Sequence, residues 1–389
     1  MTGLKILHLT TYLQGGAGKV ILDLAKAAKN NGNSVTVGFT KEPVKGYCNY
    51  SKYIKSLKEA QINKIELPTT FDRNPSKIKE TANIIVDKLQ VNAPDLIHCH
   101  AANPSRIALE FRSLTNLQIP VIQTMHGWGI YKTLDQEIED IETLNKIDQV
   151  ISISKSSDKL LKNKGLKNKR SSITYNGIDD YKSPKGSITD NDLRELIRLK
   201  KHGYFITGIV GTLDVRKNQR FVLETIKTLP KALKIKFFFI GEGEIEEMIN
   251  FANSLNITEK VNFIGYKKNG REFINHFDLL ISSSKSEGGP PIVLMEAFSS
   301  NTLALASNTP EHNEAIFEGL TGFLYETNDI FHLKQKIIKI YEMKNTKNIR
   351  LNAYELFKDK FSFNRFILEY ESIYKKLTVK KLSKESLYL

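Results

Sequence analysis

Two glutamates flank a turn rich in glycine and proline in the last third of the chain. Glu287 comes just before this turn, and Glu296 lies in the apolar run 292–298, which is typical of a helix. The turn itself consists of Gly288, Gly289, Pro290 and Pro291. Backbone N–H groups at a helix N-terminus attract anions, and carboxylates form charge-assisted hydrogen bonds with hydroxyl groups. The pattern therefore predicts a site for a ligand that carries both negative charge and hydroxyl groups.

A second segment, 211–218, supplies the positive charge that such a ligand requires. It follows an apolar run and precedes an amphipathic one, so we expect a turn from a strand into a helix. Arg216 and Lys217 lie in this turn and are expected to hold a diphosphate. One of the two glutamates, Glu287 and Glu296, is then expected to bind ribose hydroxyls, and the other to face a transferred sugar. The two segments together predict a sugar-nucleotide site.

A glycine-rich loop follows the first apolar run of the chain. Gly15 and Gly16 lie between that run and the expected helix 20–30. Glycines in such a place let backbone N–H groups approach an anion or an acceptor without interference from a Cβ atom. The spacing matches neither the nucleotide-triphosphate loop nor the dinucleotide fingerprint, and a plain tight turn is the alternative.

Histidines follow or end two further apolar runs. His126 comes just after the run 121–124, so we expect it at the carboxyl end of a strand, where α/β proteins bind ligands. His98 and His100 alternate along one expected strand and would lie on the same face. A metal pair is one interpretation, but no third ligand with suitable spacing follows them in the sequence. We therefore predict no metal site, and we predict that His100, nearer the strand end, contacts the acceptor.

Trp128 and Tyr131 follow His126 in the same loop. Their rings could line an acceptor pocket, and packing within the loop is the equally simple alternative.

The elements that position these residues form two series of short apolar runs separated by helical segments. The first series is 4–9, 35–39, 64–67, 95–98, 121–124, 149–153 and 173–175. The second series is 205–210, 235–240, 261–264, 279–282, 303–306 and 322–325. Strands alternating with helices predict two doubly wound parallel sheets, and the polar segment 181–192 is the expected linker. Because ligands bind beyond the carboxyl ends of such strands, we expect the site in a cleft between the two domains.

The serine, glutamate and glycine at 286–288, with Glu296 and Ala297 after the turn, resemble the signature of the retaining glycosyltransferases of family 4. The resemblance covers nearly the whole chain. It implies two Rossmann-like domains that face a cleft, with a C-terminal helix that crosses back to the first domain. We accordingly expect an acceptor domain at 1–180, a nucleotide-sugar domain at 193–360, and a crossing helix with a basic tail at 361–389.

The resemblance also suggests roles for individual residues. It places His126 close to the donor sugar and identifies Lys217 as the lysine that binds phosphate. Gly265 and Tyr266 are similar to a loop that holds the nucleotide base, and the loop at 15–16 is similar to the glycine pair that opens the family.

Two departures from the family pattern concern the donor site. Thr212 stands where most relatives have arginine, so Arg216 would have to replace that charge, whereas the threonine hydroxyl contributes only a hydrogen bond. Eight residues separate Glu287 from Glu296, where relatives have seven.

The activity implied by the resemblance is retaining transfer of a hexose or N-acetylhexosamine from a nucleoside-diphosphate sugar, UDP-linked by preference, to a glycan hydroxyl. In the family the leaving diphosphate assists deprotonation of the acceptor, so neither a metal nor another cofactor is expected. The expected pathway is synthesis of a bacterial surface polysaccharide such as lipopolysaccharide or capsule, with a glycan or lipid-linked glycan as acceptor. Two alternatives remain: a sugar-nucleotide epimerase or hydrolase on the same fold, and a non-catalytic protein that binds nucleotide sugars or nucleic acid.

Composition limits the compartment and the partners. The 389 residues are 40% hydrophobic and 26% charged, with a formal net charge of +14, which fits a globular chain. No run is long enough to cross a membrane and no signal peptide opens the sequence, so we expect a cytoplasmic protein. The two cysteines, Cys48 and Cys99, provide no disulfide framework.

Basic residues concentrate in three segments, 41–64, 159–170 and 375–384. Solvated surface is the simplest interpretation. The alternative is attraction to the anionic inner face of the plasma membrane. No sequence signature of a nucleic-acid-binding fold accompanies the charge, so nucleic acid is not an expected partner.

Overall fold

The computed structural model describes residues 3–68, 70–89, 92–129, 132–167, 169–182 and 188–385, with side chains described as far as residue 378. The chain divides into two compact units. The N-terminal unit comprises Met1–Asn176 and Phe366–Leu389, and the C-terminal unit comprises Gly177–Arg365. Part of the expected linker, 183–187, lies outside the described residues, as does Tyr131.

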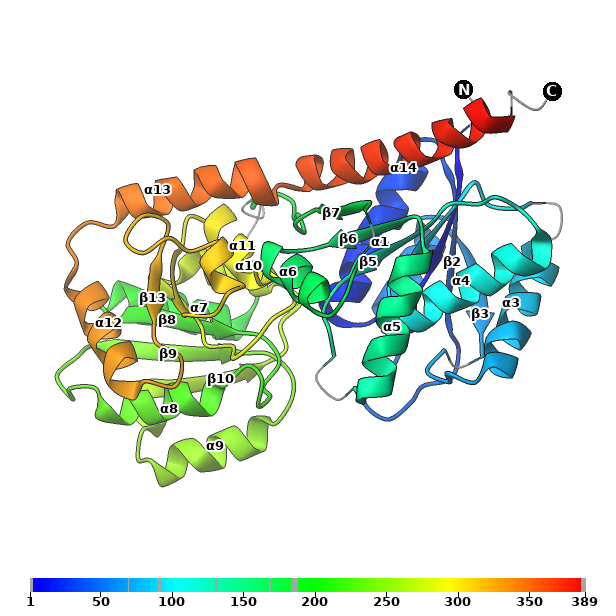
Figure 1. Ribbon diagram of the computed structural model, residues 1–389. Helices are drawn as coiled ribbons and strands as arrows, with labels where there is room; N and C mark the ends of the chain where they lie inside the picture. Colours follow the sequence, from blue (N-terminus) through cyan, green and yellow to red (C-terminus); the bar gives the residue numbers. More distant parts are fainter. Residues whose placement is uncertain are drawn as a thin grey trace. The chain divides into compact units, whose positions relative to one another are not determined.

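The N-terminal unit is built on a parallel sheet of seven strands in the order β3-β2-β1-β4-β5-β6-β7 (Figure 1). The strands are β1 (Lys5–Leu9), β2 (Ser34–Thr40), β3 (Asn63–Leu67), β4 (Leu96–Cys99), β5 (Val121–Met125), β6 (Gln149–Ser152) and β7 (Ser171–Ile173). The central strands β4 and β5 are buried along their whole length, as expected where helices cover both faces of a sheet. The strand order reverses direction between β1 and β4, which is where such sheets commonly bind ligands.

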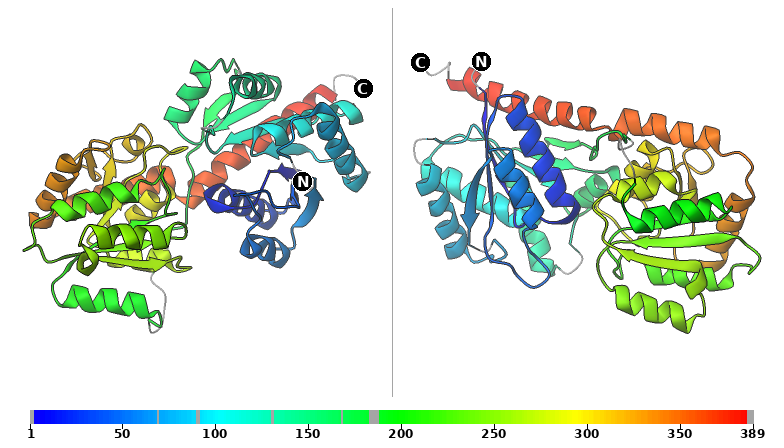
Figure 2. Two further views of the ribbon diagram at one scale, coloured as in Figure 1. Left: turned by 90° about the horizontal axis from the view of Figure 1, so that it is seen from below. Right: turned by 180° about the vertical axis from the view of Figure 1, so that it is seen from behind.

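Helices cover both faces of this sheet (Figure 2). They are α1 (Gly15–Asn30), α2 (Ser51–Glu59), α3 (Pro75–Leu89), α4 (Ala102–Thr115), α5 (Leu134–Lys146) and α6 (Lys155–Asn163). Thr133 begins α5 with a capping box, in which its side chain and that of Gln136 satisfy each other's backbone N–H groups. This cap fixes the end of the loop that leaves β5.

The last helix, α14 (Phe363–Glu385), returns to the N-terminal unit, as the family resemblance implied. Two of its tyrosines reach into the buried sheet: Tyr370 Oη lies 2.9 Å from Thr124 Oγ1, and Tyr374 Oη lies 2.7 Å from His98 Nδ1. Both tyrosine rings are almost fully buried. The helix is therefore part of the core of the N-terminal unit.

The C-terminal unit contains a second parallel sheet, of six strands in the order β10-β9-β8-β11-β12-β13. The strands are β8 (Phe205–Val210), β9 (Ile235–Ile240), β10 (Val261–Gly265), β11 (Leu279–Ser282), β12 (Leu303–Ser307) and β13 (Phe323–Tyr325). The helices are α7 (Asn191–Lys201), α8 (Gln219–Thr228), α9 (Ile245–Ser254), α10 (Gly270–His276), α11 (Ile292–Ser299), α12 (Ile330–Glu342) and α13 (Lys347–Leu356). The prediction of two doubly wound parallel sheets is confirmed.

Strand β9 illustrates why the sequence folds in this way. Phe237, Phe238 and Phe239 are consecutive and all buried, so both faces of the strand are covered by other parts of the unit.

Among the described residues no helix combines the length and the apolar character needed to cross a bilayer. Cys48 is exposed, Cys99 is buried, and both are free thiols.

Candidate functional site

The residues predicted to bind a nucleotide sugar come from loops at the carboxyl edge of the sheet in the C-terminal unit. Backbone hydrogen bonds join each of these loops to its neighbour along the edge of the sheet. The N–H of Gly211 donates to Ile240 O at 2.9 Å, and the N–H of Gly241 donates to Gly265 O at 2.9 Å. The N–H of Lys285 donates to Arg216 O, also at 2.9 Å, which ties the loop after β11 to the loop after β8.

Two glycines after β9 permit this close association. A Cβ atom on Gly241 would lie 1.9 Å from Gly211 O, closer than any real contact. Gly243 has a φ of +125°, and a Cβ there would lie 2.4 Å from Leu213 O. The glycines near 241–243 therefore serve to pack the loops together.

Arg216, Lys217 and Glu287 form one charged cluster in this edge. Arg216 Nη1 lies 2.8 Å from Glu287 Oε2, and Lys217 Nζ pairs with Glu287 Oε1. The hydroxyl of Ser284 donates to the same Oε1 at 2.6 Å. Burial by itself would raise the pKa of Glu287, but Lys217 and Arg216 outweigh it and hold that pKa below its usual value. The carboxylate is therefore ionised, and two positive charges face one negative charge.

Local structure holds the lysine of this cluster at the start of a helix. The N–H of Lys217 donates to Asp214 Oδ1 at 2.7 Å, and Ser283 Oγ donates to Lys217 O at 2.7 Å. Asn218 adopts the left-handed conformation, with φ of 59°, immediately before α8 begins. Because helix N-termini carry partial positive charge, this position adds to the charge of the lysine.

Thr212 lies in the same loop as the two cations. Its carbonyl accepts a hydrogen bond of 2.8 Å from Gln219 Nε2, near the start of α8. This hydrogen bond involves only the backbone of Thr212, and Arg216 provides the second cation of the cluster.

The turn between the two glutamates leads directly into α11. Gly289 and Pro290 are buried, Gly288 is half-buried, and Pro291 precedes the first helical residue with φ of −61°. Glu296 lies in the second half of this eight-residue helix and is half-buried. Glu287 and Glu296 thus belong to different local structures: one joins the cation cluster and the other is fixed by a helix.

The loop predicted to hold the nucleotide base follows β10. Gly265 has a φ of +68° and ends the strand, and Tyr266 beside it is 52% exposed. Lys267 pairs with Asp190 at 2.9 Å and Asp192 at 2.6 Å, which anchors the loop to the start of α7. An exposed aromatic ring on an anchored loop suits stacking against a flat ligand.

His312, which the sequence analysis did not single out, is buried beside the same edge. Its Nε2 lies 2.9 Å from Ser282 Oγ, and its Nδ1 lies 2.8 Å from Ser307 O. Burial lowers the pKa of His312 to about 4, so the ring is neutral at pH 7. The ring joins the ends of β11 and β12. It lies five residues after the end of β12, in a polar loop, so its place in the sequence offered no signal comparable to that of His126.

The N-terminal unit has a cavity of about 350 Å³ at the carboxyl edge of its own sheet. His100 and His126 line it, together with the aromatic rings of Tyr47, Phe71 and Trp128. The cavity therefore offers flat apolar surfaces beside imidazole nitrogens, a combination suited to a sugar ring with its hydroxyl groups.

Ion pairs fix the loops around this cavity. Asp140 is 1% exposed and pairs with Arg73 at 2.8 Å and with Lys132 at 2.9 Å. Lys132 Nζ also lies 3.7 Å from the centroid of the Trp128 ring, whose Nε1 donates to Glu137 Oε1 at 2.7 Å. Trp128 therefore both lines the cavity and packs within its loop.

Four histidines cluster at the cavity, of which His100 and His126 line it. His98 and His100 lie on one side of β4 with ring centroids 4.2 Å apart, as their alternation predicted. His8 comes from the neighbouring strand β1 and His126 from the end of β5. Burial lowers the pKa of His8 to about 3 and that of His126 to about 4. The cluster is therefore neutral at pH 7.

Nitrogen atoms of His8, His98 and His100 lie within 4.8 Å of one another, which is close enough to consider a metal. Spacing along the sequence could not reveal this third histidine, because it lies on another strand. Both nitrogens of His98 already face hydroxyl groups, of Tyr374 and Thr124, and both nitrogens of His100 face other imidazoles. Since no carboxylate belongs to this group, a divalent cation would have to displace these hydrogen bonds without charge compensation.

Gly15 and Gly16 are exposed at the first turn of α1. Gly15 has a φ of +54°, with open space where a Cβ would lie, and its carbonyl accepts a hydrogen bond of 3.1 Å from Tyr53 Oη. The exposed N-terminus of α1 fits the predicted contact with an anion or acceptor.

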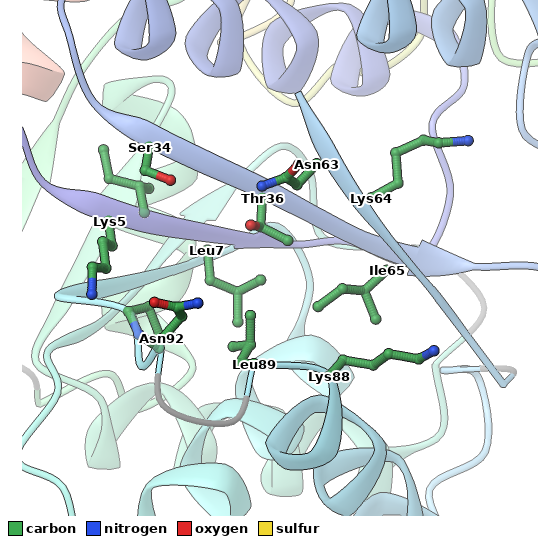
Figure 3. A pocket seen from close by; sticks show the side chains of 12 residues that line it. Lys5, Leu7, Ser34, Thr36, Asn63, Lys64, Ile65, Lys88, Leu89 and Asn92 are labelled. Carbon is green, nitrogen blue, oxygen red and sulfur yellow. The ribbon is translucent and has the colours of Figure 1, made fainter. Parts of the chain in front are cut away.

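A further cavity, of about 420 Å³, lies at the opposite edge of the same sheet (Figure 3). Lys5, Ser34 and Asn63, at the amino ends of β1, β2 and β3, line it. Open parallel sheets bind their ligands at the carboxyl edge, and none of the predicted site residues lies here. The cavity at the carboxyl edge is therefore the better candidate, although it is smaller.

Comparison with known proteins points to one kind of enzyme. Residues 14–182 match the family Glycosyltransferase Family 4, and residues 194–355 match the family Glycosyl transferases group 1. The chain is 24% identical over 294 residues to the O-antigen biosynthesis glycosyltransferase WclY of Escherichia coli, an alignment covering 73% of this chain and 79% of that protein. It is 23% identical over 310 residues to the UDP-Gal:alpha-D-GlcNAc-diphosphoundecaprenol alpha-1,3-galactosyltransferase of Escherichia coli, covering 74% and 79%.

The fold is also shared with solved structures. HepE of Anabaena, crystallised with UDP, superposes with a TM-score of 0.81 at 18% sequence identity. The match covers 96% of this chain and 100% of that one. At this level of identity the likeness establishes the arrangement of strands and helices.

Proposed function

The chain belongs to the family 4 glycosyltransferases, and from this premise we propose that it transfers a hexose or N-acetylhexosamine from a UDP-linked sugar to a glycan hydroxyl, with retention of the anomeric configuration. That the protein is a glycosyltransferase follows from the family. The donor, the stereochemistry and the acceptor are the proposed parts. The relatives named above act in O-antigen biosynthesis and on a lipid diphosphate acceptor, which supports a role in bacterial surface polysaccharide synthesis.

The observation that carries the proposal is the cluster of Arg216, Lys217 and Glu287 beside the start of α8. Departure of a nucleoside diphosphate develops negative charge on its phosphate oxygens. Preorganised cations and helix N-termini stabilise such charge without reorganisation during the reaction. The two cations face Glu287, and Asp214 Oδ2 lies 3.9 Å from Arg216 Nη2, so Arg216 and Lys217 with the helix N-terminus, rather than a local net charge, attract the diphosphate.

The proposed reaction requires no metal, because side chains supply the positive charge. It also requires no dedicated general base in the N-terminal unit. The pKa of His126 is about 4, owing to burial, so this imidazole is too weak a base to accept a proton efficiently near pH 7. We assign proton removal from the acceptor to the leaving diphosphate, on the same face of the sugar.

In this proposal the cavity lined by His100, His126 and Trp128 receives the acceptor or the sugar ring. The loop at Gly265 and Tyr266 holds the uracil base, and Glu296 binds the ribose. The turn of Gly288, Gly289 and Pro290 presents the N-terminus of α11 to the ligand, and Gly15 and Gly16 present that of α1. Thr212 contributes a hydroxyl, and Arg216 supplies the second cation.

The basic segments 41–64 and 159–170 add a proposal about location. Lys45, Lys52 and Lys55 are exposed, as expected of a surface that could attract anionic lipids. For the third segment, side chains beyond residue 378 lie outside the described residues. Binding to anionic vesicles that weakens steeply with salt would support recruitment to a membrane, and no binding at low salt would exclude it.

Thermal unfolding with a panel of nucleotides and nucleotide sugars, followed by a transfer assay, tests the proposal. A ligand at one hundred times its dissociation constant adds about 2.7 kcal/mol of stability, so UDP should raise the melting temperature clearly. Transfer of a labelled sugar should then depend on an added acceptor. Turnover of UDP-sugar without an acceptor would favour a hydrolase or epimerase, and stabilisation by GDP or ADP alone would exclude the UDP-linked donor.

A further inference from the structure

Three imidazoles form a continuous hydrogen-bonded chain that begins at the cavity of the N-terminal unit. His126 Nε2 lies 3.0 Å from His100 Nδ1, and His100 Nε2 lies 3.0 Å from His8 Nδ1. Successive rings are stacked, with centroids 5.3 Å apart in both pairs. The chain of imidazoles runs from just beyond β5, past the end of β4, to the penultimate residue of β1. Nothing in the proposed reaction uses its two inner members as acids or bases.

Each ring in this chain carries a single proton. Burial lowers the pKa of His8 to about 3 and that of His126 to about 4, and burial also places the pKa of His100 well below its ordinary value. A neutral imidazole has one N–H donor and one unprotonated acceptor nitrogen. The contacts His126–His100 and His100–His8 can therefore both be hydrogen bonds only if all three N–H groups point in the same direction along the row of imidazoles.

The inner end of the chain decides between the two directions. His8 Nε2 is buried and has no hydrogen-bond partner among the described residues. If the chain donated inward, His8 would carry its proton on this nitrogen and bury an unpaired N–H group, which folded proteins rarely tolerate. If the chain donates outward, the buried nitrogen is only an unshared acceptor, and the Nδ1–H of His8 is satisfied by His100.

We propose that His8 and His100 are positioning residues that hold His126 in the tautomer protonated on Nδ1, so that His126 presents an N–H donor to the substrate. His126 Nε2 accepts from His100, and His126 makes no other hydrogen bond to the described residues. Its Nδ1–H is therefore available to an oxygen atom of a bound molecule. The assignment of that molecule as a sugar or acceptor rests on the proposed function, whereas the assignment of the tautomer does not.

Other groups that pack around the three imidazoles do not change the direction of hydrogen-bond donation from His8 to His126. His98 lies 5.1 Å from His8 between ring centroids, but its nitrogens face Thr124 Oγ1 at 2.8 Å and Tyr374 Oη at 2.7 Å. Burial raises the pKa of Tyr374 well above its ordinary value, so this neighbour is neutral. His98 is thus as buried as the inner members of the chain yet does not belong to it, which makes it a matched control.

The test measures the tautomers directly in the full-length protein labelled with ¹⁵N-histidine. Long-range ¹H–¹⁵N spectra distinguish protonated from unprotonated ring nitrogens, and single-histidine variants assign the signals. We expect His8, His100 and His126 all to be protonated on Nδ1 at pH 7.5. Protonation of His126 on Nε2 in the wild-type protein overturns the proposal, whether or not sugar transfer is detected.

Variants of His100 then test the link to His126. His100→Phe removes the donor and should convert His126 to a mixture of tautomers, whereas His100→Asn keeps an N–H donor and should restore the Nδ1–H form. His98→Phe should leave the tautomer of His126 unchanged, and circular dichroism would check that each variant is folded. A mixture of tautomers in His98→Phe equal to that in His100→Phe would mean that packing alone sets the tautomer, and would overturn the proposed role of the chain.

Kinetics separate this inference from the proposed function. His100→Phe should lower kcat/KM for transfer by about tenfold, the effect of losing one oriented hydrogen bond, with partial recovery in His100→Asn. The rate of the wild-type enzyme should stay flat between pH 6 and 8. Spectra that show Nδ1 protonation together with no transfer from any nucleotide sugar would count against the proposed function and leave the tautomer assignment supported.

Discussion

The carboxyl edges of the two sheets hold titratable groups in opposite electrostatic states. In the C-terminal unit Glu287 is buried beside Lys217 and Arg216, and these cations keep its pKa below the ordinary value. In the N-terminal unit His8, His100 and His126 are buried among one another without a charged partner, and burial lowers their pKa values. Burial thus yields an ionised group where counter-charges are present and neutral groups where they are not.

This difference indicates a division of work between the two sites. A pair of cations beside a helix N-terminus suits the charge that develops on a leaving diphosphate, whereas neutral imidazoles and aromatic rings suit hydrogen bonding to sugar hydroxyls. Variants in the two regions should therefore change different kinetic parameters.

The largest effect is expected from Lys217→Ala in the charged cluster. This change removes a charge-assisted contact to the leaving diphosphate and should lower turnover by at least about a hundredfold, as does the loss of one preorganised donor in other enzymes. Steady-state kinetics with a UDP-sugar would measure it. Lys285→Ala, which changes a neighbouring exposed lysine, is the control and should retain normal turnover. Wild-type turnover in Lys217→Ala would show that the charged cluster is not the phosphate site.

The two glutamates should separate binding from chemistry. Glu287→Gln leaves Lys217 and Arg216 without their carboxylate, so UDP affinity should rise severalfold while turnover falls by about tenfold or more. Glu296→Gln, on α11, should instead weaken UDP binding by removing a charged acceptor for ribose hydroxyls. Calorimetry with UDP, alongside kinetics, distinguishes the two. An equal loss of UDP affinity in both variants would place Glu287 in the nucleotide site and contradict its proposed position near the sugar.

As pH falls, the folded protein should lose stability first through the buried neutral histidines and only at lower pH through the charged cluster. The folded pKa of His8 is lowered to about 3, so between pH 6.5 and 4 the unfolded chain binds more protons and stability falls as pH falls. One such group contributes up to about 1.4 kcal/mol per pH unit in this window. Glu287, whose folded pKa is also lowered, loses its contribution only at lower pH, below the range for an unfolded glutamate.

Urea unfolding at several pH values would measure this prediction. His8→Phe should flatten the dependence between pH 6.5 and 4, whereas His202→Asn, a change to an exposed histidine, should not. A pH dependence that is the same in His8→Phe as in the wild-type protein would mean that His8 is not the buried neutral group described above.

The smallest effect is expected from Trp128→Phe. This change keeps an aromatic ring at the cavity but removes the 2.7 Å hydrogen bond from Nε1 to Glu137. The Michaelis constant for the acceptor should rise about threefold, in line with the net value of one hydrogen bond, and that for the donor should not change. A change in donor affinity alone would contradict the assignment of this cavity to the acceptor.

Much of the fold could be predicted because local pattern and tertiary environment agree. The consecutive phenylalanines of β9 required a strand covered on both faces, and the alternation of strands and helices required parallel sheets. Strand ends differed by one or two residues, as at β7, predicted at 173–175 and found at Ser171–Ile173. The hydrogen bonds of Tyr374 and Tyr370 to the first sheet could not be predicted, because they join residues more than 240 positions apart.

For the candidate site, the sequence indicated residue types but not their contacts. Arg216, Lys217 and Glu287 could be singled out by residue type, but their mutual ion pairs depend on hydrogen bonds between loops. The histidine chain could not be seen in the sequence. In the sequence His8 is an ordinary strand residue, and its partner His100 lies 92 positions away. Only the fold shows that β1 and β4, which carry these residues toward each other, are adjacent strands.

The central claim is that Arg216 and Lys217 bind the diphosphate of a uridine nucleotide, and comparing UDP with uridine by calorimetry tests it most directly. Both ligands share the base and the ribose, so the difference in their affinities isolates the diphosphate. The account predicts that UDP binds at least about a hundredfold more tightly than uridine, the range expected for two charge-assisted contacts, and that Lys217→Ala, which leaves Arg216 in place, reduces this difference by about tenfold. Equal affinities in the wild-type protein, or an undiminished difference in Lys217→Ala, would contradict it.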